Sequence, residues 1–468
     1  MMGTTFMRGM LVALAFGWAA TGAFGSILSI GVLEPGPGGT AFSAVYAISP
    51  DGTWAAGGST GSNVAGTAAM GQAVLWSAGT GLVQVPNDPD PAEDQATSGR
   101  GVVVSGGNLI MGGMYYNATV GEYRMAYYSA QTSDPGGGAW AALHQNGPQV
   151  GEYNAVRTKT RNDGDPPQET VVAGRRGARP SGMGVVVESS HMYYEYRSPI
   201  EEAEATANSF ARVGRFPYSE NPIGAGWDTG NPSGARRALC LTSAASAQTV
   251  IPGGSGVYSE AYGIVPESNG TFATVVGYDR DSSAIPHAFV WSTGDTAMTM
   301  LGELSGEQSV ATDIRKIGGN LIISGSAYVG STEHAVLWDS TGVWDATGEP
   351  KLVADLLAAG GIDTSDWSSL TRVTSLSDDG RTVGGYGVWA ADGTTRGFVA
   401  DLQIPLTIVS AVSQKDHGPA GSFDVGQGST EGRRYRPPST RTSPATAAPT
   451  TAPSAAVPSR ATRSPAPS

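Results

Sequence analysis

Apolar residues in this chain occur in short runs, and turns rich in Ser, Asp and Gly separate the runs. One phrase recurs: such a turn leads into a short apolar strand that ends in Gly, and a strand of the pattern Ala-x-x-Trp follows. The first copy runs from Tyr46-Ala-Ile-Ser-Pro-Asp-Gly52 to Gln72-Ala-Val-Leu-Trp76. Three later copies end in His287-Ala-Phe-Val-Trp291, His334-Ala-Val-Leu-Trp338 and Arg396-Gly-Phe-Val399. Runs of this length and alternation predict β-strands.

A glycine that closes the apolar strand can be followed through seven copies. We place it at Gly57, Gly112, Gly174, Gly224, Gly277, Gly325 and Gly384, at intervals of 48 to 62 residues. The third and fourth copies are degenerate. A repeat of this length made of short strands predicts one four-stranded blade per copy, and therefore an all-β fold, a β-propeller of seven blades. A twisted open solenoid and a pair of β-sandwiches are the alternatives.

The two ends of the repeat region complement each other. Ser29-Ile-Gly-Val-Leu33 matches Met300-Leu-Gly-Glu-Leu304, which follows the Trp strand late in its copy. The last copy stops near Phe398-Val-Ala-Asp-Leu402, before that piece. We therefore predict that the N-terminal strand completes the last blade and closes the propeller, because closure removes the exposed sheet edges of an open array.

Trp76, Trp291 and Trp338 occupy one position of the repeat. Alternation in Ala335-Val-Leu-Trp338 places Val336 and Trp338 on one face of the strand and the other two residues on the opposite face. The three tryptophans are either a ring of aromatic platforms for sugars or part of the core between blades. We favour the core, because packing residues are what a structural repeat preserves.

The composition fits a chain of strands and tight turns. Glycine is abundant, with 67 residues, and charged residues make up 15% of the chain, which is typical of an all-β protein with many turns. Asp51-Gly52 and Asp379-Gly380 suit hairpin turns that need a positive φ, so we expect these turns to be structural. The best helical candidate is Lys351–Gly360, a short segment that ends at a Gly.

The first 25 residues resemble a secretory signal. Arg8 precedes an apolar stretch at 9–24, and Ala23-Phe24-Gly25 supplies small residues before a cleavage site. An uncleaved N-terminal anchor is the alternative. We divide the chain into a signal peptide (1–25), a β-propeller of about seven repeats (26–408) and a low-complexity Ser/Thr/Pro/Ala/Arg tail (409–468). The mature chain is expected to be secreted, extracellular or on the cell surface, without a membrane span.

The net charge of −13 is unevenly distributed. Residues 426–468 carry six Arg and one Glu, and Arg8 is the one charged residue of the first 25. Removing the +5 of residues 426–468 and the +1 of Arg8 from −13 leaves −19 for residues 26–425. An acidic surface of this size argues against nucleic acid or an anionic membrane as the partner.

The residues of the repeat resemble the bacterial extracellular HAF-repeat family, whose name comes from a His-Ala-Phe phrase. That phrase stands here as His287-Ala288-Phe289, and the Asp-Gly half that precedes it in the family stands at 44–57 and at 373–384. The resemblance covers roughly residues 29–402 and is weakest between residues 148 and 256. It implies secretion and a propeller-like fold, and it brings no established catalytic residues.

Many proteins of that family end in a Pro-Glu-Pro-type sorting tail with one apolar helix and a basic cluster. This chain departs from the pattern. Lys415–Val425 resembles the start of a short appended module, and after Val425 the apolar content gives way to Ser, Thr, Pro, Ala and Arg. The tail is either a disordered, O-glycosylated stalk or the product of a frameshift in the gene.

Acidic loops are the candidate cation sites. One Pro-rich loop contains Asp88, Asp90, Glu93 and Asp94, and Asp279-Arg280-Asp281 forms a second. Carboxylate oxygens suit Ca²⁺, which takes about six to eight of them. Because the spacing fits no known calcium motif, we favour a solvated acidic loop and predict no obligatory cofactor.

His287 and His334 occupy equivalent positions of the repeat, which suggests a pair of metal ligands. The same position holds Gln72 and Arg396 in other copies, and this variety argues against a metal site. Cys240 is the only cysteine of the chain, and we expect it to be a small buried residue with no disulfide and no reactive thiol.

The repeat and the leader together predict a secreted, non-enzymatic β-propeller, monomeric, that binds an extracellular polysaccharide or an envelope protein. Arg175-Arg176 and Arg179 form a basic cluster that suits either an acidic polysaccharide or an exposed hairpin turn. The alternative is a glycoside hydrolase or polysaccharide lyase with carboxylates that face each other across the central channel. The chain has no His-Glu-x-x-His and no Gly-x-Ser-x-Gly motif, so we assign no catalytic residue.

Overall fold

The computed structural model divides into two compact units, Met1–Ile408 and Val409–Ser468, and the described residues all lie in the first unit. The described ranges are 25–35, 40–60, 72–86, 95–117, 122–141, 151–160, 168–176, 183–186, 194–196, 205–211, 223–228, 235–241, 248–266, 273–305, 308–317, 319–339 and 349–402. Residues 1–24 of the predicted signal peptide and the predicted tail at 409–468 lie outside these ranges.

The described strands form seven four-stranded sheets with antiparallel neighbours, numbered here from 1 to 7. The all-β fold predicted from the short alternating runs is therefore confirmed. Sheets 1 to 3 consist of β2 (Ser43–Ile48), β3 (Ala55–Ser59), β4 (Gln72–Ser77) and β5 (Gly81–Gln84); β6 (Gln95–Ser105), β7 (Asn108–Asn117), β8 (Glu122–Gln131) and β9 (Asp134–Ala141); and β10 (Gly151–Thr160), β11 (Gln168–Arg176), β12 (Met183–Val186) and β13 (Tyr194–Tyr196).

Sheets 4 to 6 each follow the same order of four consecutive strands. They consist of β14 (Ala205–Ala211), β15 (Ile223–Asp228), β16 (Arg237–Leu241) and β17 (Gln248–Val250); β18 (Tyr258–Pro266), β19 (Ala273–Arg280), β20 (Pro286–Ser292) and β21 (Thr299–Met300); and β22 (Ser309–Ile317), β23 (Asn320–Val329), β24 (Thr332–Asp339) and β25 (Lys351–Leu352). Sheet 7 differs, because it combines β26 (Trp367–Leu376), β27 (Thr382–Trp389) and β28 (Thr395–Asp401) with β1 (Ile27–Ser29).

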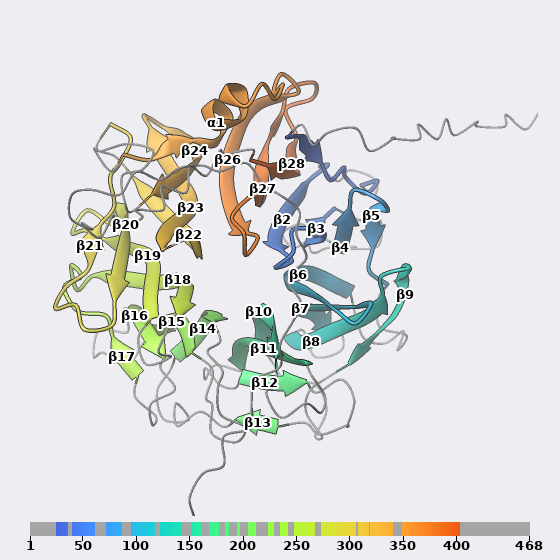
Figure 1. The fold of residues 1–468 in the computed structure, drawn as a ribbon, viewed down its shortest axis with the longest axis horizontal. Coiled ribbons are helices and arrows are strands. Elements are labelled where there is room, and N and C mark those ends of the chain that lie inside the picture. The colour runs from blue at the N-terminus through green and yellow to red at the C-terminus, as the bar shows by residue number, and fades with distance from the viewer. Residues whose placement is uncertain are drawn as a thin grey trace, which may run out of the picture. The chain divides into compact units, whose positions relative to one another are not determined.

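The sheets follow one another in chain order, with β2, β6, β10, β14, β18 and β22 nearest the centre of Figure 1. The first strand of each sheet contacts the first strand of the next sheet, and β26 of sheet 7 contacts β2 of sheet 1. The N-terminal strand β1 pairs with β28, with Ile27 opposite Ala400 and Ser29 opposite Phe398. Sheet 7 is thus built from both ends of the repeat region.

The first strand of each sheet carries a β-bulge at one common position, and β6 has one further bulge and β26 two. The residue at this bulge position is Tyr46, Arg100, Asn154, Asn208, Tyr262, Thr312 or Thr374 in sheets 1 to 7 respectively. A bulge twists a strand and redirects the side chains around it. Its recurrence in all seven sheets makes it part of the repeat.

Each bulge lies opposite a glycine of the second strand. These glycines are Gly57, Gly113, Gly174, Gly226, Gly277, Gly325 and Gly385. Four positions predicted from the sequence are therefore correct, whereas Gly112, Gly224 and Gly384 are wrong by one or two residues. The glycines also lie within the second strands and do not end them.

A steric reason for the glycine is visible wherever its surroundings are described. A Cβ atom on Gly325 would lie 1.9 Å from the carbonyl oxygen of Val310, and one on Gly277 would lie 1.9 Å from that of Glu260. The bulge turns this carbonyl toward the second strand, so only hydrogen fits there.

The hydrophobic core lies between successive sheets. Trp291 packs with Ala225 and Cys240 of sheet 4, and Trp338 packs with Val276 of sheet 5. The exposed fractions of Trp76, Trp291 and Trp338 are 7%, 2% and 1%. The preferred interpretation of these tryptophans as inter-sheet core is confirmed, because a buried ring offers no platform to a sugar.

Two turns have the chemistry predicted for them. Gly52 and Gly380 adopt φ values of 74° and 68°. In the first turn the Ser49 hydroxyl donates to Asp51 Oδ1 over 2.5 Å and accepts from Trp54 N over 2.9 Å. Ser377 and Asp379 repeat this arrangement. The hydrogen bonds of these side chains stabilise the turns, so we assign them a structural role.

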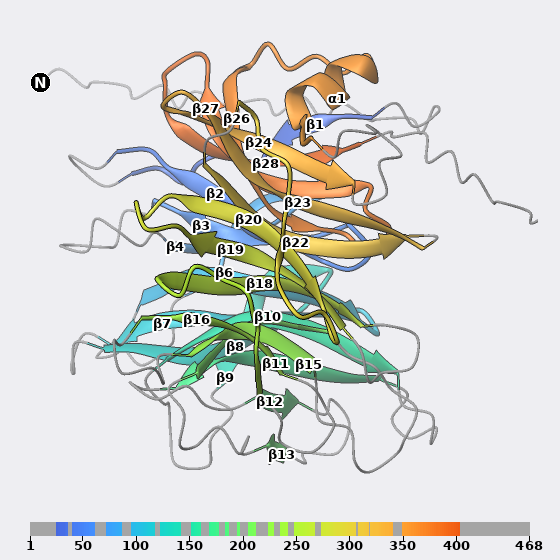
Figure 2. The same cartoon turned by 90° about the vertical axis from the view of Figure 1, so that its left-hand side faces the viewer.

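The predicted short helix is α1 (Val353–Ala359), followed by Gly360 and by Gly361 at a φ of 74°. It buries Val353 and Leu357 and contacts β24, β25 and β26. Figure 2 shows α1 at the periphery of the strands. Among the described residues, no helix has the length and hydropathy needed to cross a membrane.

Candidate functional site

Polar side chains collect where the first strand of a sheet begins and the second strand ends, which we call the start edge. In sheet 5 the carboxylate of Glu260 is 2% exposed. It accepts hydrogen bonds from the Tyr258 hydroxyl over 2.6 Å, from the Tyr262 hydroxyl over 2.5 Å and from Arg236. We call these residues, with Trp227, Tyr278 and Arg280, the tyrosine cluster.

The electrostatics of the tyrosine cluster keep its phenols protonated. Burial, together with the Glu260 carboxylate, raises the pKa of Tyr258 and of Tyr262 well above the usual value. Both hydroxyls can therefore donate to Glu260 at any physiological pH. The three donors thus satisfy the hydrogen-bonding capacity of the buried Glu260 side chain.

Stacked rings and guanidinium groups form the rest of the tyrosine cluster. The Arg236 Cζ lies 3.9 Å from the ring centroid of Trp227. The Arg280 Cζ lies 4.6 Å from the ring of Tyr258 and 5.6 Å from that of Tyr278. Tyr278 also stacks on Tyr258, with centroids 6.0 Å apart. These contacts hold both guanidinium groups in fixed orientations.

A second Arg–Glu arrangement joins sheets 6 and 7. Arg372 donates from Nε and Nη2 to Glu333 Oε1 over 2.8 and 2.5 Å. Tyr386 lies opposite Arg372 in the strand register. Burial raises the pKa of Tyr386, although the positive charge of Arg372 works in the other direction. Arg372 and Glu333 thus satisfy each other within the protein, as Arg236 and Glu260 do.

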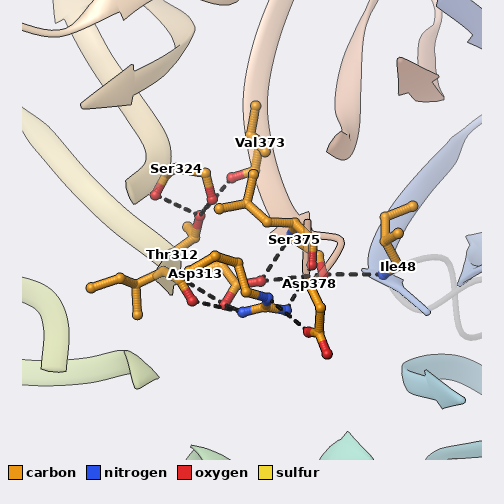
Figure 3. A network of polar contacts seen from close by, with 10 residues as sticks. Ile48, Thr312, Asp313, Ser324, Val373, Ser375 and Asp378 are labelled. Carbon is orange, nitrogen blue, oxygen red and sulfur yellow. Dashed lines mark hydrogen bonds and ion pairs between the residues drawn. The ribbon is translucent and has the colours of Figure 1, made fainter. Parts of the chain in front are cut away.

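A third network, on the other side of the bulges, joins three sheets (Figure 3). Asp313 Oδ1 accepts from Ile314 N over 2.9 Å and from Arg315 Nη1 over 2.6 Å, and Asp313 Oδ2 accepts from Leu376 N over 2.9 Å. The Ser375 hydroxyl lies 3.4 Å from Asp313 Oδ2 and accepts from Ile48 N over 3.1 Å. This Asp313 network connects β22, β26 and β2, and therefore the last two sheets and the first.

The bulge residues add contacts between neighbouring first strands. The Thr312 hydroxyl donates to the carbonyl oxygen of Val373 over 2.7 Å, and the Thr374 hydroxyl donates to that of Val45 over 2.8 Å. In each case the acceptor precedes the bulge residue of the next sheet. The bulge positions therefore hold one sheet against the next in the same register.

His287, the histidine of the His-Ala-Phe phrase, contacts two carboxylates. Its Nδ1 lies 2.5 Å from Glu303 Oε1, and its Nε2 lies 3.7 Å from Asp281 Oδ2. Burial works against the charged form, but Glu303 and Asp281 together raise the pKa of His287 above its usual value of 6.5. No group of three or more His, Cys, Asp or Glu within the described ranges could hold a metal ion.

The raised pKa of His287 predicts a pH-dependent effect of the substitution His287→Gln. The ion pairs of His287 stabilise the fold fully below about pH 6.5 and lose that effect as the pH rises through the raised pKa. We expect the variant to lose about 0.5–1 kcal/mol of unfolding free energy at low pH and less at high pH.

Thermal unfolding at about pH 5.5 and about pH 9 measures this difference. His334→Gln is the control, because His334 occupies the equivalent position of the next sheet and makes no ion pair among the described residues. A loss of stability in His287→Gln that is equal at both pH values would contradict the assignment.

Other candidates from the sequence have different outcomes. Asp88, Asp90, Glu93 and Asp94 lie outside the described residues, as does Arg179; Arg175 and Arg176 lie in β11. Asp279 is not in a loop but in β19, where its Oδ2 accepts from Ser255 N over 2.7 Å. Asp281 closes a turn by accepting from Ser283 N over 2.8 Å and from Ile285 N over 2.9 Å. The second acidic loop is therefore not a free set of oxygen ligands.

Cys240 is fully buried in the core between sheets 4 and 5. Burial raises the pKa of its thiol to about 12. The predicted small buried residue is confirmed, and the thiol carries no nucleophilic chemistry at neutral pH.

The sequence analysis did not identify the tyrosine cluster or the Asp313 network, although a signal for them was present. The apolar strand of the repeat begins Ala261-Tyr262-Gly263-Ile264 in sheet 5 and Ala311-Thr312-Asp313-Ile314 in sheet 6, and the two residues between Ala and Ile vary. Both pairs lie at the bulge, one residue of each pair being the extra one. Variable residues at a fixed place in a repeat indicate positions that the core does not constrain.

Comparisons with known proteins give distant likenesses of structure. No protein-family model matches the chain, and no curated protein matches it. Sqt1 of Chaetomium thermophilum is 13% identical, with 77% of this chain and 82% of that chain covered and a TM-score of 0.35. The β-propeller domain of the Trilobed protease from Pyrococcus furiosus is 9% identical, with 80% and 98% covered and a TM-score of 0.38. YjhT is 10% identical, with 67% and 95% covered and a TM-score of 0.33.

Proposed function

We propose that residues 26–408 form a closed β-propeller of seven blades, and that it acts as a secreted, non-enzymatic binding or scaffold module. Its ligand is an extracellular polysaccharide or an envelope protein. The closed frame, the composition of the start edge and the hydrogen bonds of the buried carboxylates support this function.

Closure is supported by contacts between the first and last sheets. β2 contacts β26, β27 and β28, the Asp378 amide donates to the carbonyl of Pro50 over 2.8 Å, and β1 supplies the fourth strand of sheet 7. A closed ring has no exposed edge between its first and last blades and holds its loops on a rigid frame.

The composition of the start edge is the observation that carries the binding function. Val257 and Val329 are 42% and 46% exposed there, beside Tyr258 and Tyr328 in the chain. The Arg236 side chain is 37% exposed. Arginine and tyrosine are the residues that dominate the energy of binding surfaces, and exposed apolar side chains beside them add contact area.

A binding role fits the described carboxylates better than acid–base catalysis. Glu260 accepts from two tyrosines and one arginine, and Glu333 accepts from Arg372. A catalytic acid or base must exchange a proton with a substrate, whereas these oxygens are occupied by donors of the protein itself. The leader at residues 1–25 supports secretion, and the N-terminus of protein recovered from the medium should then be Ser26.

Thermal unfolding of the mature chain with diverse extracellular polysaccharides, with purified envelope proteins, and with Ca²⁺ or EDTA tests the function. A ligand that binds only the folded state raises the midpoint temperature of unfolding. At a ligand concentration a hundredfold above Kd, the stabilisation is about 2.7 kcal/mol. We expect one ligand class to raise it without being degraded. Release of new sugar ends would support the hydrolase or lyase instead, and no shift with any ligand would contradict a binding role.

A further inference from the structure

Arg280 differs from Arg236 and Arg372, two other arginines of the start edge. Arg236 pairs with Glu260 and Arg372 pairs with Glu333. Within the described part of the chain, no oxygen accepts a hydrogen bond from the Arg280 guanidinium, and its Nε is buried. Its side-chain contacts are the rings of Tyr258 and Tyr278. Among the described residues, Arg280 is therefore a positive charge that is fixed in place and has no acceptor.

A carboxylate is the ligand that this guanidinium suits. The planar guanidinium matches the two oxygens of a carboxylate, and stacking on two rings means that little entropy is lost when it binds. Arg100 also stacks on a ring, that of Tyr46, and its Nε is unpaired too, but side chains of the neighbouring sheet 3 are not described.

The cluster favours an acidic peptide over an acidic sugar. Sugars bind on open aromatic faces. The ring faces of this cluster are covered, because Arg280 lies against Tyr258, and Tyr258 and Tyr262 both stack on Tyr278. Val257, next to Tyr258, exposes 42% of its surface to an apolar contact. Arginine and tyrosine are the residues that dominate the energy of protein-binding centres, and Val257 adds apolar contact area beside them.

Local charge permits an acidic partner although the protein as a whole is acidic. Asp279 and Asp281 flank Arg280 in the sequence, but successive residues of a strand point to opposite faces. Asp279 shares the face of His287 in β19, and Asp281, just beyond the strand, lies near His287 as well, whereas Arg280 shares the face of Tyr278. Arg236 and Glu260 neutralise each other, so Arg280 leaves the tyrosine cluster with one positive charge.

We propose that the tyrosine cluster binds an acidic segment of a partner protein, with a side-chain carboxylate on Arg280 and a neighbouring apolar side chain against Val257. This inference rests on the proposed binding function and names the class of its partner. The binding should weaken as salt is added, because a partly exposed ion pair is screened.

Panning a phage-displayed library of random short peptides on the intact mature chain tests the proposal. We expect selected peptides rich in Asp and Glu beside an apolar residue. Titration of the synthetic forms should then give at least about tenfold weaker binding to Arg280→Gln, and intermediate binding to Arg280→Lys, which keeps the charge without the fork. Unchanged thermal midpoints would exclude misfolding as the cause.

Arg396→Gln is the matched control. Arg396 also stacks on a ring, that of Trp389, but it pairs with Asp392, so its loss should not affect the peptides. Peptides that bind Arg280→Gln as well as the unmodified protein would overturn the site while leaving the binding function intact. Oligogalacturonate that binds through Arg280 in place of any peptide would overturn the peptide class. Failure of peptides, glycans and envelope proteins alike would overturn both proposals.

Discussion

Replacing Gly325 with alanine is expected to lower the free energy of unfolding by about 3 kcal/mol or more. The new Cβ would lie 1.9 Å from the carbonyl oxygen of Val310 and 2.9 Å from the carbonyl carbon. Neither atom can move alone, because both belong to β22 at its bulge and are held by the pairing with β23. The second strand must therefore shift, and with it the core packing of sheet 6. Chemical denaturation followed by tryptophan fluorescence measures the loss.

The matched control is Gly79→Ala. Gly79 is exposed, and the nearest atom to a Cβ placed there is the Ser77 hydroxyl at 4.0 Å. We expect its effect to stay within about 0.5 kcal/mol. If Gly325→Ala were as mild as Gly79→Ala, the steric explanation of the repeated glycine would be wrong.

Asp313→Asn is the second substitution with a large expected effect, at about 3 kcal/mol. Asparagine is almost identical to aspartate in shape, but it accepts hydrogen bonds at one oxygen only, because an amide NH2 replaces the other oxygen. Its amide group would face either the Arg315 guanidinium or the Leu376 amide, both of which are donors. The buried charge of Arg315, which is 7% exposed, would also lose its nearest carboxylate.

Asp378→Asn separates the buried network from a surface ion pair. Asp378 Oδ1 lies 3.1 Å from Arg315 Nε, but its side chain is 62% exposed. An exposed pair contributes about 1 kcal/mol at most. Urea titration of both variants gives the comparison, and the double variant Asp313→Leu/Arg315→Met should recover part of the loss because it removes both charges. Equal effects of Asp313→Asn and Asp378→Asn would show that the Asp313 network does not hold the sheets.

The fold could be predicted to a large extent because the repeat preserves what every sheet needs. The turn at Asp51-Gly52, the buried Trp291 and the helix that ends at Gly360 each follow from a local rule of conformation or burial. The exact register could not be predicted in the same way. Adjacent glycines such as Gly112 and Gly113 are equivalent in sequence, and only the bulge opposite Gly113 decides between them.

The candidate site could not be predicted, for a different reason. Glu260 lies in β18, Arg280 lies at the end of β19, and Arg236 directly precedes β16 of the neighbouring sheet. Their contacts depend on how one sheet packs on the next, which no spacing in the sequence encodes. The His-Ala-Phe phrase misleads in this respect, because His287 is the conspicuous residue and yet it pairs with Glu303 and Asp281.

The residues that hold neighbouring sheets together and the residues proposed to bind a partner lie on opposite sides of the bulges. The Asp313 network and the paired turns near Pro50 and Asp378 connect sheets 6, 7 and 1 on one side of the bulges. The tyrosine cluster and the Arg372–Glu333 pair lie on the other side, toward the start edge. Substitutions on the first side should therefore change stability, and those at Arg280 should change binding.

Closure of the ring by β1 is the claim on which this account depends, and a disulfide tests it most directly. Hydrogen bonds from Asp401 N to Ser26 O and from Ile30 N to Gly397 O flank the pair Ile27 and Ala400. That pair is therefore a non-hydrogen-bonded one, with Cα atoms about 4.5 Å apart, a separation that a disulfide can span.

The measurement is peptide mass spectrometry of the double variant Ile27→Cys/Ala400→Cys after mild oxidation. Buried Cys240 is the only other thiol of the chain, so background reaction is low. If β1 closes the ring, a disulfide forms between residues 27 and 400 within a monomer. Free thiols at both positions, or a disulfide that joins two chains, would contradict it.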